Sequence, residues 1–319
     1  MVRVIPISYR NKKYPDGIVP KIEEIPAHFD SKITNSNLDY SLHTEYSYGP
    51  RKFTCSACKD LAGIKVTDSK GVPKLWFNNM WVKDFIRFIL RFIGDKKPPR
   101  LIEIHPPFND YCKNLSCFIQ LYMHFEDEIL SRYPKTEILV ENRYGSQYSE
   151  GFFILSTVND LKELTELIKE HNLKLRIALD FPQLFSAHHF DVGRFTKDGM
   201  SEIFKQLYPI RKCIGSIHLW GKCLGKNNRI SAHMGTLDSY FKGLRCEDIT
   251  ADNVITLNSY TEVDASNNDD NNIKRHFLRE LHNLLSDGSA RYFLPEVNSK
   301  SGHLQSIVRD LIDLGFKFI

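Results

Sequence analysis

Residues 101–105 read Leu-Ile-Glu-Ile-His, a short apolar run that ends in a residue able to bind a metal ion. Five similar runs, residues 38–43, 137–141, 175–180, 214–218 and 292–296, end in His43, Glu141, Asp180, His218 and Glu296. Short runs rich in Ile, Leu and Val are typical of buried parallel strands. Because a parallel barrel places its active site where its strands end, we expect His105 and these five side chains to meet at one mouth. The pattern therefore indicates a metal site.

Helical periodicity recurs between these runs. In residues 81–92, WVKDFIRFILRF, the apolar residues Phe85, Ile86 and Ile89 share one face. Further helical patterns cover residues 115–130, 157–171, 197–208, 272–285 and 304–314, and further strands are expected at 2–7 and 253–258. The polar segment 259–272 is expected to be a loop. Repeated βα units predict a parallel sheet. We expect one α/β domain over residues 1–319, a (β/α)8 TIM barrel with its metal site at the C-terminal face of the strands.

Composition and charge exclude few classes of protein. The formal net charge of +4, from 43 basic and 39 acidic residues, is compatible with an anionic substrate but is no signature of nucleic-acid binding. The N-terminus lacks the apolar stretch of a signal peptide, and no segment is long enough to span a bilayer. Seven cysteines, an odd number, favour a reducing compartment over a disulfide framework. We expect a cytoplasmic protein with no membrane contact.

The strand-end donors can be divided between two cations. A carboxylate at the centre of the mouth can bridge two ions, which two-metal sites hold about 3.5–4 Å apart. One ion would take His43, His105 and Glu141. The other would take Glu141, Asp180, His218 and Glu296. In the alternative, acids at strand ends cap helices or pair with a barrel lysine, but burying six such groups without cations would be costly.

The motifs around these donors resemble a known family. They read Leu42-His43-Thr44, Ile104-His105-Pro106, Val140-Glu141-Asn142, Leu179-Asp180, Ile217-His218-Leu219 and Pro295-Glu296. Their order and spacing resemble the metal-binding strand ends of the xylose-isomerase-like TIM barrels, in particular the endonuclease IV branch (AP endonuclease family 2). The resemblance runs from about residue 38 to the C-terminus. It implies divalent ions, Zn, Mn or Fe, in a barrel mouth, and a hydrolase of DNA repair that cleaves the phosphodiester at abasic sites.

The sequence departs from that family at the third metal ion. The family takes a histidine three residues after the aspartate and an Asp-x-His pair after the strand-six histidine. Here these positions hold Gln183 and Ser231-Ala232-His233. Only His233 is retained, as a weaker candidate ligand, although His188 or His189 could substitute. We therefore expect a dinuclear rather than a trinuclear centre.

Sugar isomerases and epimerases of the same superfamily provide the main alternative. They keep one ion on a quartet that here would be Glu141, Asp180, His218 and Glu296, and the two glutamates move a proton beside a carbonyl. His43 and His105 favour phosphoester hydrolysis, because a one-metal isomerase has less need of two further imidazoles. In hydrolysis, Glu296 or Asp180 would orient the attacking hydroxide, and Lys222 or Arg143 would steady the phosphate. A metal-binding barrel without catalysis is the third alternative.

A second set of metal-binding residue types follows two of the strands. Cys55 and Cys58 come after the strand that ends at His43, and Cys112 and Cys117 come after the strand that ends at His105. Four thiolates in this spacing could hold a structural zinc ion or an iron-sulfur cluster. The alternative is that these cysteines bind nothing.

Cations and aromatic residues are interleaved after the strand ends. They are Phe53, Arg143, Tyr144, Tyr148, Phe181, Phe185, Trp220, Lys222, Lys226 and Arg229. Such a mixture suits phosphates and stacked bases, so damaged DNA or a small phosphorylated or sugar-like substrate is the expected partner. In the alternative, the aromatic residues pack loops onto the barrel and the cations are solvated.

Overall fold

Strand order defines the fold of the computed structural model, which describes residues 1–148, 150–249 and 272–319. The main sheet has the order β10-β7-β6-β5-β4-β3-β2-β1-β11, and β10 also pairs with β1. Eight strands therefore close on themselves, and helices connect most of them, as in a (β/α)8 barrel. The expected fold class is confirmed. The eight strands are β1 (Val2–Ser8), β2 (Ile22–Ala27), β3 (Asp39–Thr44), β4 (Leu101–Ile104), β5 (Glu137–Glu141), β6 (Arg176–Asp180), β7 (Ile214–His218) and β10 (Ala290–Leu294).

The chain divides into two compact units. The central unit comprises Lys21–His188 and Cys213–Ser216, and the terminal unit comprises Met1–Pro20, His189–Lys212 and Ile217–Ile319. The expectation that the chain is one domain stays a prediction.

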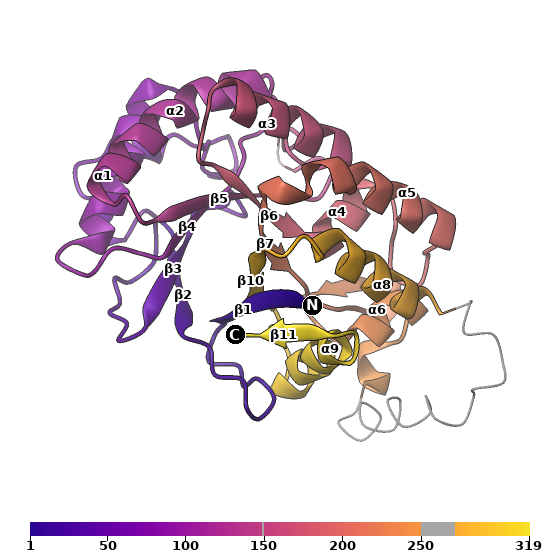
Figure 1. The fold of residues 1–319 in the computed structure, drawn as a ribbon. Coiled ribbons are helices and arrows are strands. Elements are labelled where there is room, and N and C mark those ends of the chain that lie inside the picture. Colours follow the sequence, from indigo (N-terminus) through magenta and orange to yellow (C-terminus); the bar gives the residue numbers. More distant parts are fainter. Residues whose placement is uncertain (149, 250–271) are drawn as a thin grey trace, which may run out of the picture. The chain divides into compact units, whose positions relative to one another are not determined.

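In the central unit, parallel strands β2 to β6 are flanked by helices. The helices are α1 (Asn79–Ile93), α2 (Leu115–Arg132), α3 (Val158–Glu170) and α4 (Phe181–Ala187), and short 3-10 turns are η1 (Ser56–Cys58) and η2 (Gly63–Lys65). Helix α1 begins where the Asn78 side chain accepts the Trp81 N–H, and it ends before Gly94, whose φ is +56°. Figure 1 shows α1, α2 and α3 in sequence order on one side of the strands.

An aromatic core lies between the first two helices and the strands. Trp76 is buried against Trp81, Phe85, Phe118 and Phe125, with ring centroids 5.1 to 5.7 Å from its own. Its indole Nε1 donates to the carbonyl of His105 at 2.8 Å. The core therefore fixes the backbone directly after β4, where one of the expected metal ligands lies.

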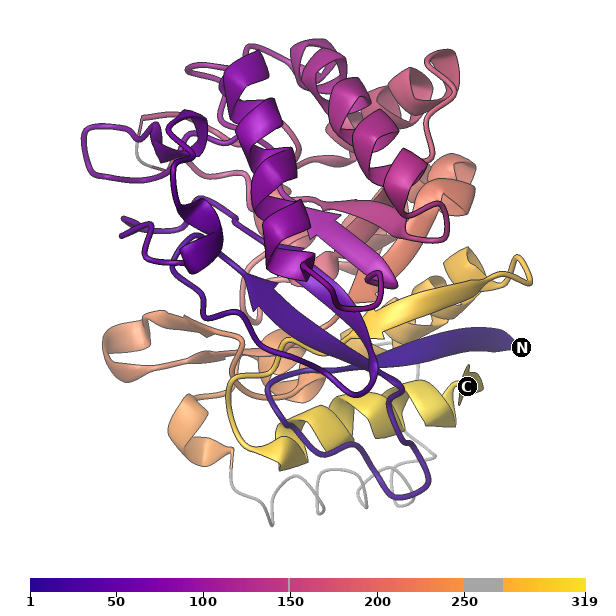
Figure 2. The same cartoon turned by 90° about the vertical axis from the view of Figure 1, so that its left-hand side faces the viewer.

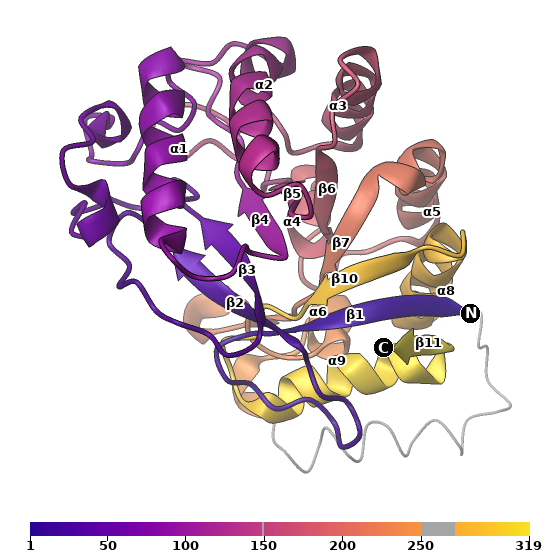
Figure 3. The ribbon, with the colours of Figure 1, turned by 60° about the vertical axis from the view of Figure 1, so that its left-hand side comes forward.

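In the terminal unit, β1 pairs in parallel with β10 and with β11 (Phe316–Phe318), for example Ile5 beside Tyr292. Its helices are α5 (Lys197–Leu207), α6 (Leu237–Lys242), α8 (Ile273–Leu285) and α9 (Ser301–Asp313). A hairpin of β8 (Lys222–Leu224) and β9 (Ile230–Ala232) follows β7, and 3-10 turns are η3 (Tyr208–Cys213), η4 (Lys226–Asn228) and η5 (Cys246–Asp248). Figures 2 and 3 show α9 and β11 beside β1.

All six expected helices are present within a few residues of their expected ends, as are β1 and the six strands that carry the donor residues. Strand β2 was missed because Ile22-Glu23-Glu24-Ile25-Pro26-Ala27 places two carboxylates and a proline in a short run. The strand expected at 253–258 lies outside the described residues, as does the expected loop at 259–272 except for Asn272.

One cysteine pair forms a disulfide that the cysteine count did not predict. Cys223 on β8 and Cys246 in η5 form a disulfide, with their Cα atoms 5.1 Å apart. Cysteine count could not reveal this pair, because the partners are 23 residues apart and meet only through the hairpin. No helix among the described residues is long and apolar enough to cross a membrane.

Candidate metal centre

Three of the expected donors meet at the carboxyl ends of neighbouring strands in the central unit. His43 lies near the end of β3, His105 directly follows β4, and Glu141 is the last residue of β5. The Nε2 atoms of His43 and His105 are 3.1 Å apart, and His105 Nε2 lies 2.8 Å from Glu141 Oε2. Both His105 and Glu141 are 1% exposed. The arrangement brings two ring nitrogens and a carboxylate oxygen to one point.

Hydrogen bonds on the far side of each ring set the direction of the lone pairs. His105 Nδ1 donates to the Glu45 carbonyl at 3.1 Å, so Nε2 of the neutral ring carries a lone pair. Burial lowers the pKa of His105 to about 4, although Glu141 opposes the shift, so the ring is neutral near pH 7. His43 Nδ1 lies 3.3 Å from Glu24 Oε1, a partner that directs the Nε2 lone pair of His43 towards His105.

These three atoms fit a divalent cation. Two imidazole lone pairs and a carboxylate repel one another unless a positive charge lies between them. Zinc binds such atoms at about 2.0–2.2 Å, which separates tetrahedral ligands by roughly 3.3 Å. The separations of 2.8 and 3.1 Å are slightly shorter than this spacing, so a small outward shift would admit an ion.

The other oxygen of Glu141 is held by protein donors. Arg143 Nη1 lies 3.3 Å from Glu141 Oε1, and the Gln183 side-chain amide also donates to this oxygen. The same amide nitrogen donates to Asp180 Oδ2 at 2.9 Å. Asp180 Oδ1 accepts the backbone N–H of Gln183 at 2.8 Å, so this acid also caps α4. Gln183 therefore links the two carboxylates at the ends of β5 and β6.

A buried ion pair supports the backbone that orients His105. Arg51 Nε donates to both carboxylate oxygens of Glu45, at 2.9 and 3.0 Å. Burial raises the pKa of Glu45, whereas Arg51 and two backbone N–H groups oppose the shift. The guanidinium groups of Arg51 and Arg143 lie 5.1 and 5.7 Å from the ring centre of Tyr46. The ion pair fixes Glu45, whose backbone carbonyl accepts the hydrogen bond from His105 Nδ1.

The remaining expected donors lie in the terminal unit. His218 Nδ1 is 3.8 Å from Glu296 Oε1, and His233 Nδ1 is 3.6 Å from Glu296 Oε2. His233 Nδ1 also bonds the Glu296 carbonyl at 2.9 Å, and its ring stacks on Trp220 with centroids 3.9 Å apart. Lys222 is buried, with its Nζ 5.4 Å from the ring of Trp220 and 5.0 Å from that of Tyr240.

The structure thus brings the expected donors together within each unit. His43, His105 and Glu141 adjoin in the central unit, where Gln183 connects Asp180 to them. His218, His233 and Glu296 adjoin in the terminal unit. Three glutamates beside these donors in the central unit were not predicted: Glu24, Glu45 and Glu103. The position of Glu103 could have been predicted from the sequence. It lies two residues before His105 in the same apolar run, and strand residues two apart share a face.

The structure gives no support to the possible metal site on Cys55, Cys58, Cys112 and Cys117. Among the residues that the structure describes, no cysteine belongs to a group of three or more side chains that could hold an ion. Burial raises the pKa of Cys58 and of Cys112 to about 12, which keeps both as thiols. Cys58 Sγ donates to the Phe29 carbonyl at 3.5 Å, so this side chain helps to hold a loop.

The aromatic residues and cations that follow the strand ends are divided between the core and the surface. Phe181 and Phe185 are at most 1% exposed and belong to the core, which agrees with the packing alternative. Lys226 and Arg229 are exposed beside the β8–β9 hairpin. His188 Nε2 accepts the backbone N–H of Val158 at 3.1 Å, which occupies that ring nitrogen at the start of α3.

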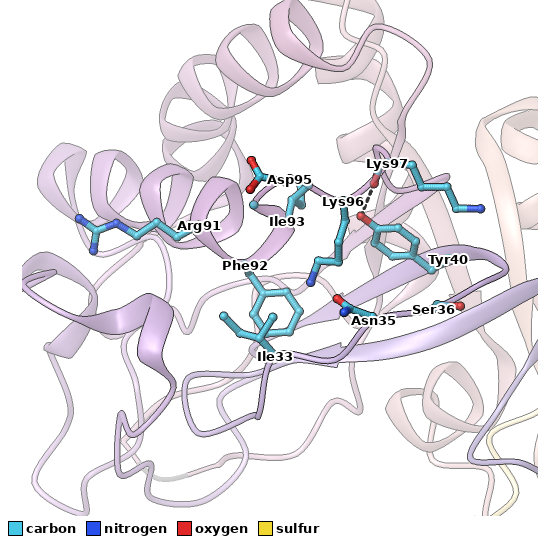
Figure 4. A pocket seen from close by; sticks show the side chains of 11 residues that line it. Ile33, Asn35, Ser36, Tyr40, Arg91, Phe92, Ile93, Asp95, Lys96 and Lys97 are labelled. Atoms are coloured by element: carbon cyan, nitrogen blue, oxygen red, sulfur yellow. Dashed lines mark hydrogen bonds between the residues drawn. The ribbon is translucent and has the colours of Figure 1, made fainter.

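A cavity of about 500 Å³ lies elsewhere in the central unit. Figure 4 shows its lining from the end of α1 and the segment before β3, with Lys96 near Phe92 and with Tyr40 bonded to the Lys97 carbonyl. Tyr40 is the second residue of β3, whereas His43 is near the end of that strand. The cavity therefore lies towards the amino ends of the strands, where barrels carry residues for stability rather than catalysis.

Comparison with solved structures finds similar folds at low sequence identity. An AP endonuclease of family 2 from Brucella melitensis is 9% identical, covering 95% of this chain and 96% of that chain, with a TM-score of 0.47. A D-psicose 3-epimerase solved in the presence of D-fructose is 10% identical over 97% and 90%, with a TM-score of 0.44. A xylose isomerase domain protein from Planctomyces limnophilus is 11% identical over 85% and 75%, with a TM-score of 0.40. No protein-family model and no curated protein matches the sequence.

Proposed function

We propose that this chain is a divalent-metal-dependent hydrolase of phosphoester bonds with a dinuclear centre. The observation that carries the proposal is a cluster of three donor atoms in the central unit. His105 Nε2 lies 3.1 Å from His43 Nε2 and 2.8 Å from Glu141 Oε2. A one-ion sugar isomerase is served by the quartet of Glu141, Asp180, His218 and Glu296 and has less need of the two further imidazoles. Two ligand sets are what in-line displacement at phosphorus uses, one for each reacting oxygen.

In this proposal His43, His105 and Glu141 would hold the first ion. Asp180, His218 and Glu296 would hold the second, and Glu141 would serve both. Two facts support the second set. His218 and Glu296 lie 3.8 Å apart in the terminal unit, and Asp180 is linked to Glu141 by Gln183 in the central unit. Mixed nitrogen and oxygen ligands suit Zn, Mn or Fe.

The protein's own residues would orient the reacting groups. Bound divalent ions lower the pKa of water towards neutrality and neutralise charge that develops on phosphate. Asp180 or Glu296 would accept a hydrogen bond from the attacking water and orient it. Arg143, which is buried and fixed on Glu141, would donate to a phosphate oxygen, as would Lys222.

The experiment compares purified wild-type protein with Glu141→Gln on a DNA duplex that contains one abasic site, with added zinc or manganese. We expect the wild type to nick the duplex and Glu141→Gln to lose this activity, because a glutamine side chain cannot act as a ligand to both ions as a carboxylate can. Glu137→Gln is the matched control, since it changes a glutamate at the other end of β5. Uncleaved duplex in the presence of bound metal would contradict the proposal.

A sugar isomerase or epimerase with one ion is the second candidate. The observation that favours it is the Gln183 amide, which lies between Glu141 and Asp180 where the resembling endonucleases use a histidine ligand. In the same experiment, conversion of a ketose without nicking would support this candidate. Bound metal with neither reaction would support a metal-binding barrel without catalysis.

A further inference from the structure

A second carboxylate adjoins the His43–His105–Glu141 cluster. Glu103 lies on β4 directly beside His43 of β3 in the strand register, and it precedes His105 by two residues. Strand residues two apart point to the same face, so Glu103 and His105 face the same way. Glu103 is 3% exposed, and its Oε1 lies 3.9 Å from His43 Nε2.

The ligand atoms of these four residues form one compact set. One atom each from His43, Glu103, His105 and Glu141 lies within 4.8 Å of all the others. We infer that Glu103 is the fourth ligand of the ion, which gives a His2Glu2 site built by the central unit alone. The inference rests on the metal-binding part of the proposed function and does not depend on hydrolysis.

The chemistry of the four donors fits a divalent ion. Two neutral imidazoles and two carboxylates balance the charge of the ion, and an ion between two buried carboxylates offsets the free energy of burying them. Each imidazole is oriented from behind, His43 by Glu24 and His105 by the Glu45 carbonyl. Such outer partners are typical of metal-binding histidines.

A ligand from Glu103 would also assign a role to this ion. Four protein ligands would fill a tetrahedral shell, so a reacting oxygen would have to join this ion as a fifth ligand, an expansion that zinc sites undergo in the transition state. The ion would also hold the carboxyl ends of β3, β4 and β5 together and fix Glu141.

The test is a cobalt(II) titration without substrate. Glu296→Gln serves as the background, because it weakens the other set and leaves the four donors intact. One ion with the intense visible absorption of four-coordinate cobalt is expected. Adding Glu103→Gln should weaken binding at least ten-fold and shift the visible bands, because water replaces a carboxylate at the ion. Glu137→Gln in the same background is the control, and no change is expected.

The outcomes separate this inference from the proposed function. Unchanged affinity and spectrum in Glu103→Gln would overturn the role of Glu103. If that variant fails to fold, the background protein alone decides, because weak five- or six-coordinate bands would also overturn the inference. A Glu103 effect in a protein that cleaves no phosphoester would retain the inference and reject hydrolysis. Wild-type protein that binds no cobalt would reject both.

Discussion

Gln183 connects two acids that the sequence analysis assigned to metal. Its amide nitrogen donates to Glu141 Oε1 and to Asp180 Oδ2, so one neutral group bridges two buried carboxylates. In the family that the strand-end motifs resemble, a histidine occupies the corresponding position and binds an ion. The side chain at residue 183 therefore determines how these carboxylates are satisfied when no ion is bound.

Replacing Gln183 by alanine tests this role. Without metal, Gln183→Ala should lower the free energy of unfolding by about 1–3 kcal/mol, because buried acceptors lose their donor. Added zinc should raise the melting temperature of Gln183→Ala more than that of the wild type, because an ion can replace the amide. Thermal unfolding with chelator and with zinc measures both effects. Gln206→Ala, which removes an exposed bond to Glu202, is the control, and equal stability of Gln183→Ala and wild type without metal would refute the role.

The strand-end rule found the ligand candidates but not the residues that orient them. His43, His105 and Glu141 could be predicted because each follows an apolar run. Glu24 could not, because its strand is interrupted by charge and proline. The role of Glu45 lies in its carbonyl, which no side-chain pattern records. The fourth cluster residue, Glu103, lies two residues before the end of its apolar run, so a rule based on the last residue of each run does not identify it.

At the scale of elements, long amphipathic helices were predictable and short irregular elements were not. Helices α1 and α2 have apolar stripes that pack on strands, and both lie where the pattern placed them. Helix α4 was missed because Phe181-Pro182-Gln183-Leu184-Phe185-Ser186-Ala187 is short and almost wholly buried, so it shows no polar face. The strands of the β8–β9 hairpin are only three residues each, too short to show a period, and Cys223 of β8 is tied to Cys246 by the disulfide.

Three helices of the terminal unit meet at a buried ion cluster whose stability should depend on pH. Lys274 of α8 pairs with Asp238 of α6 at 2.5 Å and with Asp310 of α9 at 2.9 Å. Burial raises the pKa of Asp310 to about 6, although Lys274 opposes the shift. The pKa of Asp238 is instead lowered, because both Lys274 and Lys242 outweigh its burial. Of the two acids, Asp310 is therefore the one that gains a proton on folding under mild acid.

The direction of the pH effect follows from that raised pKa. The folded state binds more protons than the unfolded state between the unfolded value of about 3.9 and the folded value, so the contribution of Asp310 falls as pH rises through this window. The free energy of unfolding of wild type relative to Asp310→Asn should fall by on the order of 1–3 kcal/mol from pH 4 to pH 7. Urea unfolding of both proteins measures it. Asp127→Asn, an exposed change on α2, is the control; a pH-independent difference for Asp310→Asn would refute the assignment.

At the scale of the whole molecule, alternation of apolar runs and amphipathic helices was sufficient to predict a (β/α)8 strand order. The same pattern did not identify every strand, because it did not predict β2. The division of the donors was also beyond the sequence: the ends of β3 to β6 belong to the central unit, and His218 and Glu296 belong to the terminal unit. Burial of the cysteines and formation of the Cys223–Cys246 disulfide depend on packing that no spacing rule contains.

The most direct test of the account is anomalous diffraction at the zinc edge from crystals grown with zinc. We expect a peak about 2.0–2.2 Å from His43 Nε2, His105 Nε2 and a Glu141 oxygen. Crystals in which this cluster holds no ion at saturating zinc, or in which zinc lies only at surface residues, would contradict the central claim that these side chains form a metal centre.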